Sequence, residues 1–242
     1  MKILLILLLL IPINIFAIEK IQPHHPTYII AGDKNNQVKY QVSIKYPLWY
    51  PYKSGIAIAY TQIAHWDLYD QSSPFRELNH NPEIFIERTN DIKFIDFYRI
   101  IPYTHISNGR DGASNRSVDA GAVEMQLSYG DFINFGIREK ITCFYNLANQ
   151  NKDYKRYRGN FETELFAQIK SRKGYFSHER LYIKGEWTKH FGWLECGLST
   201  RIITTKFRPH IYIQYFYGYS EFLINYNQKT NALRAGFIFN PE

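Results

Sequence analysis

Apolar and polar residues alternate with a period of two along most of this chain. From Val38 to Leu48 the even positions are apolar or aromatic and the odd positions are mostly polar, and a similar alternation runs from Phe207 to Tyr219. Successive side chains of a β-strand point to opposite faces, so each such segment predicts a strand with one apolar and one polar face. Beyond the N-terminal segment, no helical periodicity competes with this pattern.

About twelve segments show this alternation, and several are longer than ten residues. Strands of globular proteins usually have about five or six residues, whereas a strand that crosses a membrane needs about 9–11. Aromatic residues make up 17% of the chain, which suits the aromatic girdles of a membrane barrel. A soluble sandwich or barrel also fits the alternation, but the strand lengths favour an all-β, antiparallel transmembrane β-barrel. The expected strands are 26–32, 37–48, 55–67, 82–88, 94–107, 117–129, 131–146, 158–171, 174–188, 191–204, 206–219 and 231–240.

The expected connections alternate between long and short. Long connections are expected at 68–81, 108–116, 147–157 and 220–230, and short ones near 89–93, 130, 172–173 and 205. Long outer loops that alternate with short periplasmic turns are typical of Gram-negative outer-membrane barrels. The sequence indicates one barrel domain without a second domain or a repeat of fixed period.

Composition excludes several other classes of protein. The mean hydropathy is −0.36, which excludes a bundle of transmembrane helices, because each helix needs roughly 20 mostly apolar residues. The net charge is +7, and a basic balance can indicate nucleic acid or an anionic membrane surface. Because no single basic run dominates, nucleic acid is not an expected partner.

The N-terminal segment predicts export. Lys2 is followed by a short apolar run that ends at the small residue Ala17, a pattern typical of a signal peptide. We therefore expect a signal peptide at 1–17 and the outer-membrane barrel at 18–242. Export permits a disulfide between Cys143 and Cys196, although one cysteine pair in a chain of this length is weak evidence for one.

Three polar residues are expected on the outer wall of the barrel, beside the loop at 108–116. His105 and Ser107 share a face of one predicted strand, and a hairpin centred near Gly112 brings Asp119 beside His105. Polar groups beside lipid are costly unless they are hydrogen-bonded. A hydroxyl, an imidazole and a carboxylate in this order can act as nucleophile, base and orienting group. The alternative is hydration of the three side chains in the headgroup region. The same parity places Arg99 on the lipid face, with its charge extended to the opposite headgroups.

These residues lie in a segment that resembles the outer membrane phospholipase A family. The hallmark of that family is His-X-Ser-Asn-Gly-Arg followed by a loop rich in Ser, Asn and Arg, and this chain has HISNGR at 105–110. Further stretches that resemble the family cover most of the chain after residue 17. They are QVSIKYPL at 41–48, AYTQ at 59–62, SSPFRELN at 72–79 with Pro82, YGYSE at 217–221 and LINYN at 223–227.

The resemblance implies a twelve-stranded barrel that hydrolyses acyl esters of phospholipids in the outer leaflet, with A1, A2 and lysophospholipase specificity. Carried onto this chain, Ser107 matches the nucleophile and His105 the general base. The backbone amide of Gly109 matches an oxyanion donor. The third catalytic position is normally Asn and falls on Asp119, which also orients a histidine in ordinary serine hydrolases.

The resemblance also implies a homodimer that depends on Ca²⁺ at its interface. The expected ligands are the Arg110 carbonyl and the Asn115 side chain of one subunit, together with the Ser72 carbonyl of the other. The family normally has Ser at the position of Asn115, which still offers an oxygen of the kind that Ca²⁺ accepts. The C-terminus also departs from the usual pattern. Outer-membrane barrels often end on an aromatic residue, whereas here Asn240, Pro241 and Glu242 follow the last aromatic residue, Phe239.

Two other groups of residues suggest chemistry less strongly. Glu83 and Glu87 share a face of one predicted strand, and a barrel lumen explains them better than a glycosidase pair. His24 and His25 could bind a metal ion, but an exposed linker is the simpler interpretation. The second hypothesis for the whole chain is a non-enzymatic barrel, either a small pore or a degenerate phospholipase relative.

Overall fold

The computed structural model describes residues 21–35, 37–89, 94–169, 176–188, 192–202 and 209–239. The expected signal peptide therefore lies outside the described residues. None of the helices among these residues has the length and hydrophobicity of a membrane-spanning helix.

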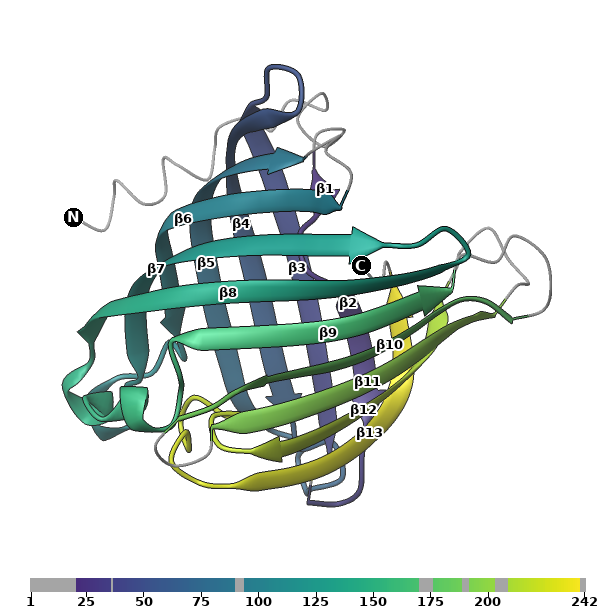
Figure 1. Cartoon of the computed structure of the whole chain (residues 1–242). Coiled ribbons are helices and arrows are strands. Elements are labelled where there is room, and N and C mark those ends of the chain that lie inside the picture. Colours follow the sequence, from purple (N-terminus) through teal and green to yellow (C-terminus); the bar gives the residue numbers. More distant parts are fainter. Residues whose placement is uncertain are drawn as a thin grey trace, which may run out of the picture.

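The described chain consists almost entirely of antiparallel strands (Figure 1). Short 3-10 turns, η2 (Gly112–Ser114), η3 (Asn149–Asn151) and η4 (Tyr154–Arg156), lie in the connections at one end. The strands are β1 (Gln22–Pro23), β2 (Thr27–Ala31), β3 (Val38–Trp49), β4 (Ser54–Trp66), β5 (Phe75–Thr89), β6 (Ile95–Ser107), β7 (Ser117–Tyr129), β8 (Ile133–Leu147), β9 (Phe161–Ile169), β10 (Phe176–Glu186), β11 (Trp193–Ile202), β12 (His210–Gly218) and β13 (Thr230–Phe239).

The sheet closes on itself as a twelve-stranded barrel. Each strand from β2 to β13 pairs with the next, and β13 pairs with β2, with Ala235 opposite Ala31. The short β1 pairs with β3 farther along than β2 does, so β1 and β2 form one interrupted strand. The predicted barrel and its approximate strand number are confirmed.

One predicted connection is too long. The stretch at 68–81 was expected to be a loop, but β5 begins at Phe75, so the loop spans 67–74 only. The apolar alternation that marks 82–88 is replaced at the start of β5 by polar side chains on both faces. Glu77 is fully buried there and accepts the backbone N–H groups of Leu223 and Ile224 from the β12–β13 connection. Because this end of β5 is polar and binds another loop, its residues do not alternate between apolar and polar with a period of two.

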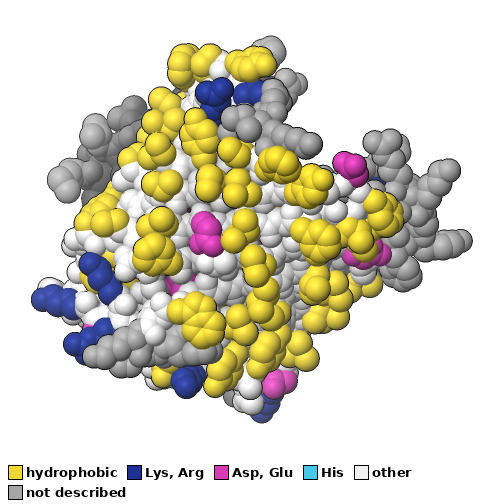
Figure 2. All heavy atoms as spheres, in the orientation of Figure 1, with side chains coloured by type: hydrophobic (Ala, Val, Ile, Leu, Met, Phe, Trp, Pro, Cys, Tyr) yellow, Lys and Arg dark blue, Asp and Glu magenta, His cyan; other side chains and the backbone are white. Residues whose placement is uncertain are grey.

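The alternation otherwise separates lumen from exterior as predicted. In β3, Lys39 and Ser43 are buried inside, whereas Val42 and Ile44 are exposed outside. Figure 2 shows hydrophobic side chains across the middle of the visible wall, with Lys and Arg near its edges. This is the surface expected of a barrel whose outer wall faces hydrocarbon.

A β-bulge in β6 corrects the predicted position of Arg99. Between Ile101 and Thr104 two residues of β6 lie opposite one residue of β7, so the faces exchange at this point. Gly121 lies opposite the bulge, where an added Cβ would come within 3.3 Å of the Ile101 carbonyl. Before the bulge the odd positions face the lumen, and Arg99 is therefore buried inside instead of facing lipid.

Ion pairs fill much of the lumen. Arg99 donates to Glu87 at 2.8 Å and to Glu124 at 2.6 Å, and Glu87 also pairs with Lys45. Farther round the wall, Arg180 pairs with Glu164. The lumenal position expected for Glu83 and Glu87 is thus correct, and these charges are compensated inside the barrel.

Candidate active site on the outer wall

His105 and Asp119 form a hydrogen bond on the exterior of the barrel. They lie directly opposite each other on β6 and β7, and His105 Nδ1 donates to Asp119 Oδ1 at 2.6 Å. Both side chains are partly buried, with 31% of His105 and 18% of Asp119 exposed. The bulge in β6 places His105 and Asp119 on the same outward face, which is the face that the sequence predicts.

A second residue of β6, one residue of β8 and the core hold Asp119 in place. Tyr103 donates its hydroxyl to Oδ1 at 3.2 Å, and Asn146 Nδ2 donates to Oδ2 at 2.7 Å. On the inner side, the neighbouring residues Val118 and Ala120 pack in a buried cluster with Phe144, Tyr154, Leu223 and Tyr226. The carboxylate is therefore fixed by three donors and by a rigid strand beneath it.

Sequence reasoning missed the role of Asn146. Strict alternation places Asn146 on the same face as Phe144, which is buried in the lumen. A second bulge, between Asp119 and Ala120 in the pairing of β7 with β8, turns Asn146 outward beside Asp119. Period-two patterns carry no signal for a bulge, so only the register reveals this contact.

Ser107 lies one outward position beyond His105 on β6. Its Oγ accepts the backbone N–H of Gly109 at 3.1 Å. Gly109 has a left-handed φ of +63°, which favours glycine at this turn. Among the contacts of the described residues, Ser107 makes no hydrogen bond to His105. The structure thus brings the expected oxyanion donor to the hydroxyl and the expected orienting group to the imidazole.

The loop from 108 to 116 is organised around the buried side chain of Asn108. Its amide donates to the Ser114 carbonyl at 2.9 Å and accepts the N–H groups of Arg110 and Arg116. Asn115 closes the 3-10 turn η2 through its N–H to the Gly112 carbonyl. Arg110 and Asn115, two of the expected Ca²⁺ ligands, therefore lie on one ordered loop.

Ser72 lies on the adjacent outer loop, at 67–74. It is exposed and has a left-handed φ of +68°, and the guanidinium of Arg110 donates to the Arg76 carbonyl just beyond this loop. A backbone carbonyl on each loop and one amide side chain are oxygen donors of the kind that Ca²⁺ accepts. The residues present fit a calcium site in their chemistry.

Tyr60 and His80 form a second polar pair beside Ser107. His80 lies directly opposite Ser107 on β5, and its Nδ1 is 2.6 Å from the Tyr60 hydroxyl. An added Cβ on Gly109 would lie 3.6 Å from His80 Nε2. Neither residue has a role predicted from the sequence, because their proximity to Ser107 depends on the register of β5 against β6.

An apolar groove lies on the outer wall next to these residues. It has a volume of about 380 Å³ and crosses β3, β4, β5 and β6. Its apolar and aromatic lining residues are Ile44, Tyr46, Ile58, Ala59, Tyr60, Pro82, Ile84 and Tyr103. Tyr60 contacts His80 and Tyr103 contacts Asp119, so the groove begins at the polar cluster and continues across the hydrophobic wall.

Comparison with known proteins gives a consistent result. A family model described as phospholipase A1 matches residues 8–239. The phospholipase A1 proteins of Salmonella typhimurium and Escherichia coli K12 are each 29% identical, over 218 and 221 residues, and each alignment covers 86% of this chain and 71% of the relative.

Solved structures with the same barrel are also found. The outer membrane phospholipase of Salmonella typhi, a dimer with bound calcium, is 26% identical with a TM-score of 0.77, covering 94% of this chain and 93% of the other. The outer membrane phospholipase A of Escherichia coli is 25% identical with a TM-score of 0.75, covering 91% of both chains.

Proposed function

The chain belongs to the phospholipase A1 family, and from this premise we propose that it is an outer-membrane phospholipase that cleaves acyl esters of outer-leaflet phospholipids. The observation that carries the proposal is the His105–Asp119 hydrogen bond on the exterior wall, beside the Ser107 hydroxyl. A polar cluster of this kind on a hydrocarbon-facing surface is costly, and a pore, which acts through its lumen, has no need of it.

In the proposed reaction Ser107 Oγ attacks the ester carbonyl of the phospholipid. His105 accepts the hydroxyl proton at Nε2 while its Nδ1–H stays bonded to Asp119, and it then returns the proton to the leaving glycerol oxygen. Water, deprotonated by the same imidazole, hydrolyses the acyl-serine and releases the fatty acid. The Gly109 N–H, which lies 3.1 Å from Ser107 Oγ, is the donor placed to stabilise the oxyanion. A bond between Ser107 and His105 forms when substrate binds, because such bonds often tighten only in the substrate complex.

Asp119 serves in place of the Asn that the family resemblance implies. Its negative charge stabilises the imidazolium of His105 as well as holding the ring. The hydroxyl of Tyr103 and the amide of Asn146 supply the hydrogen bonds that offset the cost of a carboxylate near lipid.

We assign the acyl chain of the substrate to the apolar groove across β3–β6. A chain bound along Ile58 and Ile84 buries its methylene groups and leaves its ester beside Tyr103 and the catalytic residues. We further propose that both the sn-1 and sn-2 esters, and lysophospholipid, are accepted, because an open groove on a wall imposes little selection on the headgroup side.

Activity is proposed to require Ca²⁺ and a homodimer. The Arg110 carbonyl and the Asn115 amide oxygen would hold the ion together with Ser72 of the partner subunit. When bound, the ion supplies positive charge that polarises water toward the oxyanion. The calcium-bound dimer of the Salmonella typhi relative supports this assignment. A site shared by two subunits leaves the monomer nearly inactive, which protects the membrane that contains the enzyme.

The test is release of fatty acid from phospholipid micelles by the refolded protein, with calcium and with a chelator. Ser107→Ala should lower the rate by about 10³-fold or more, and the chelator should abolish most of the wild-type rate. Ser117→Ala is the matched control, because Ser117 lies directly opposite Ser107 on β7 and has no assigned chemistry. It should stay within about threefold of the wild-type rate.

Each outcome separates the hypotheses. No release by folded wild-type protein favours the degenerate barrel, and release that survives Ser107→Ala removes Ser107 from the mechanism. Release at an unchanged rate in the presence of the chelator refutes the proposed calcium site but not the role of Ser107. Phospholipids labelled separately at the sn-1 and sn-2 chains show which esters are cleaved.

A further inference from the structure

The segment between β1 and β2 folds into the lumen instead of forming an exposed linker. Pro23 and Pro26 lack N–H groups, and they flank the point at which the first strand is interrupted. The N–H groups of His24 and His25 donate to the backbone carbonyl and to the hydroxyl of Ser43 on β3. This interruption directs both imidazoles toward the inside of the barrel.

The two imidazoles lie beside the carboxylate of Glu83 on β5. His24 Nε2 donates to Glu83 Oε2 at 2.8 Å, and His25 Nε2 lies 3.9 Å from the same oxygen. The two ring centroids are 4.1 Å apart. One ligand atom from each of the three residues lies within 4.8 Å of the other two.

His24 is left incompletely bonded by these contacts. Its side chain is fully buried, and its Nδ1 has no hydrogen-bond partner in the part of the chain that the structure describes. With Nε2–H given to Glu83, Nδ1 of the neutral ring is an unpaired basic nitrogen in a buried position. Because no partner among the described residues fixes Nδ1, the ring can carry its proton there and present Nε2, the nitrogen that faces Glu83, to a bound ion.

We propose that His24, His25 and Glu83 form a binding site for a divalent transition-metal ion, with Zn²⁺ as the natural probe. Two imidazoles and one carboxylate are a ligand set typical of zinc, and a water molecule completes four-coordination. Small side-chain movements suffice, because the ligand atoms are already within 4.8 Å of one another. The ion would join the N-terminal segment to β5 and so fix the interrupted first strand of the barrel.

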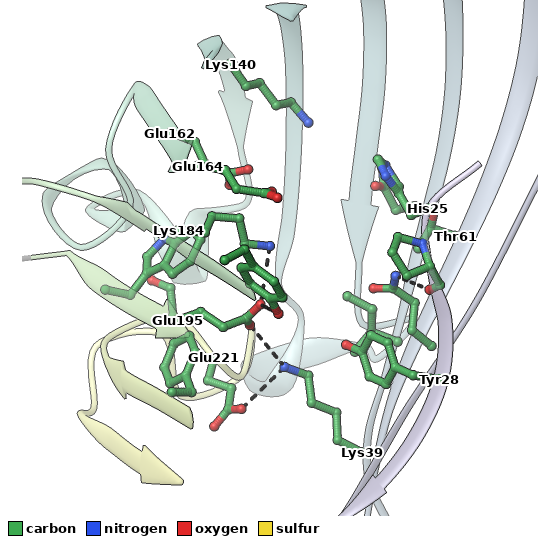
Figure 3. Close-up of a pocket in the computed structure, with 18 of the residues that line it drawn as sticks. His25, Tyr28, Lys39, Thr61, Lys140, Glu162, Glu164, Lys184, Glu195 and Glu221 are labelled. Carbon is green, nitrogen blue, oxygen red and sulfur yellow. Dashed lines mark hydrogen bonds and ion pairs between the residues drawn. The ribbon is translucent and has the colours of Figure 1, made fainter. Parts of the chain in front are cut away.

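The surroundings allow an ion and its water to enter. Figure 3 shows His25 at the wall of the lumenal cavity, which has a volume of about 300 Å³. Arg99 and Lys140 are cations close enough to act on His24 and Glu83. Arg99 is held by Glu87 and Glu124, and Lys140 extends into the same cavity from β8. Glu162 and Glu164 also line the cavity, where they pair with Arg158 and Arg180.

The experiment titrates Zn²⁺ and Co²⁺ into refolded protein in detergent micelles, with calcium in excess so that the proposed outer site is filled. We expect one equivalent of Zn²⁺ to bind and Co²⁺ to give visible bands of low-coordinate cobalt. His25→Ala and Glu83→Gln should each weaken Zn²⁺ binding about 100-fold. His65→Gln is the matched control, because it removes a different buried lumenal histidine, and it should change affinity less than threefold.

The variants make the proposal refutable even if one of them folds poorly. Glu83 is nearly fully buried, whereas the side chain of His25 is 25% exposed, so His25→Ala tests the site in a barrel that keeps its His24–Glu83 bond. Absence of Zn²⁺ binding by the wild-type protein overturns the proposal. Equal loss of binding in His65→Gln and in His25→Ala also overturns it, because the ion then responds to general disturbance of the lumen. Fatty-acid release is not the readout, so the result is independent of the proposed phospholipase activity.

Discussion

Asp119→Asn tests whether the charge at the third catalytic position contributes to the rate. The introduced amide oxygen can accept from His105 and Tyr103, and its NH₂ group then faces Asn146, whose own amide must flip to present its oxygen. All three hydrogen bonds survive, and the ring of His105 keeps its tautomer. The substitution therefore removes the negative charge and little else.

The expected loss is about tenfold in kcat. A hydrogen bond to a charged group contributes about 1.5–3 kcal/mol and a neutral one about 0.5–1.5 kcal/mol, so the imidazolium loses about 1–1.5 kcal/mol of stabilisation. About 1.4 kcal/mol corresponds to a factor of ten in rate. The exposure of His105 and Asp119, 31% and 18%, keeps the Coulomb energy beyond the hydrogen bond small because water screens it.

The assay is the initial rate of fatty-acid release at saturating substrate and calcium, for wild type, Asp119→Asn, Asp119→Ala and Tyr103→Phe. Asp119→Ala also removes the acceptor that fixes the His105 tautomer, and it should lower kcat by about 10³-fold. Tyr103→Phe removes only the 3.2 Å bond and should cost less than about threefold. An Asp119→Asn rate equal to or above that of wild type refutes the reasoning, because the charge then gives no benefit.

Two further predictions concern the groove and the lumen. Ile84→Trp should fill the apolar groove and lower kcat/KM by about tenfold with little change in folding, as measured with long-chain phospholipid, whereas a short-chain ester should be less affected. Arg99→Met should leave Glu87 and Glu124 without their shared partner and destabilise the barrel by about 3 kcal/mol in urea unfolding from micelles. The control Arg76→Met breaks a more exposed pair and should cost less than about 1 kcal/mol, so equal losses would contradict the buried-network argument.

Sequence periodicity predicted the barrel because membrane and lumen impose opposite demands on adjacent residues. Outward positions are mostly apolar, whereas lumenal positions can be polar. The alternation of residue types in a strand such as β3 therefore shows which side chains face outward and which face the lumen. The bulge in β6 exchanges the two faces of the strand, and nothing in the residue pattern marks its position. The prediction that Arg99 faces lipid was therefore wrong. The start of β5 was missed because Glu77 binds a loop instead of packing in an alternating pattern.

The candidate site was also predicted only in part. Its central residues, His105, Ser107 and Asp119, were predicted because a strand and a hairpin relate them through local geometry, and the His105–Asp119 bond is present. The contacts of Asn146 and His80 come from neighbouring strands, and their positions depend on register. Register is decided by pairing along whole strands, which no local pattern contains.

By itself, the sequence determined that this chain forms an antiparallel barrel and which hairpin carries its polar outward cluster. The barrel follows from the hydrophobic alternation of most strands, and the hairpin follows from the order of its residues along two adjacent strands. Only the tertiary structure decided which polar groups support Asp119, that Arg99 balances Glu87 and Glu124, and that His24 and His25 meet Glu83 inside the lumen. These contacts join residues far apart in the chain, and closure of the barrel with its bulges is what brings them within bonding distance.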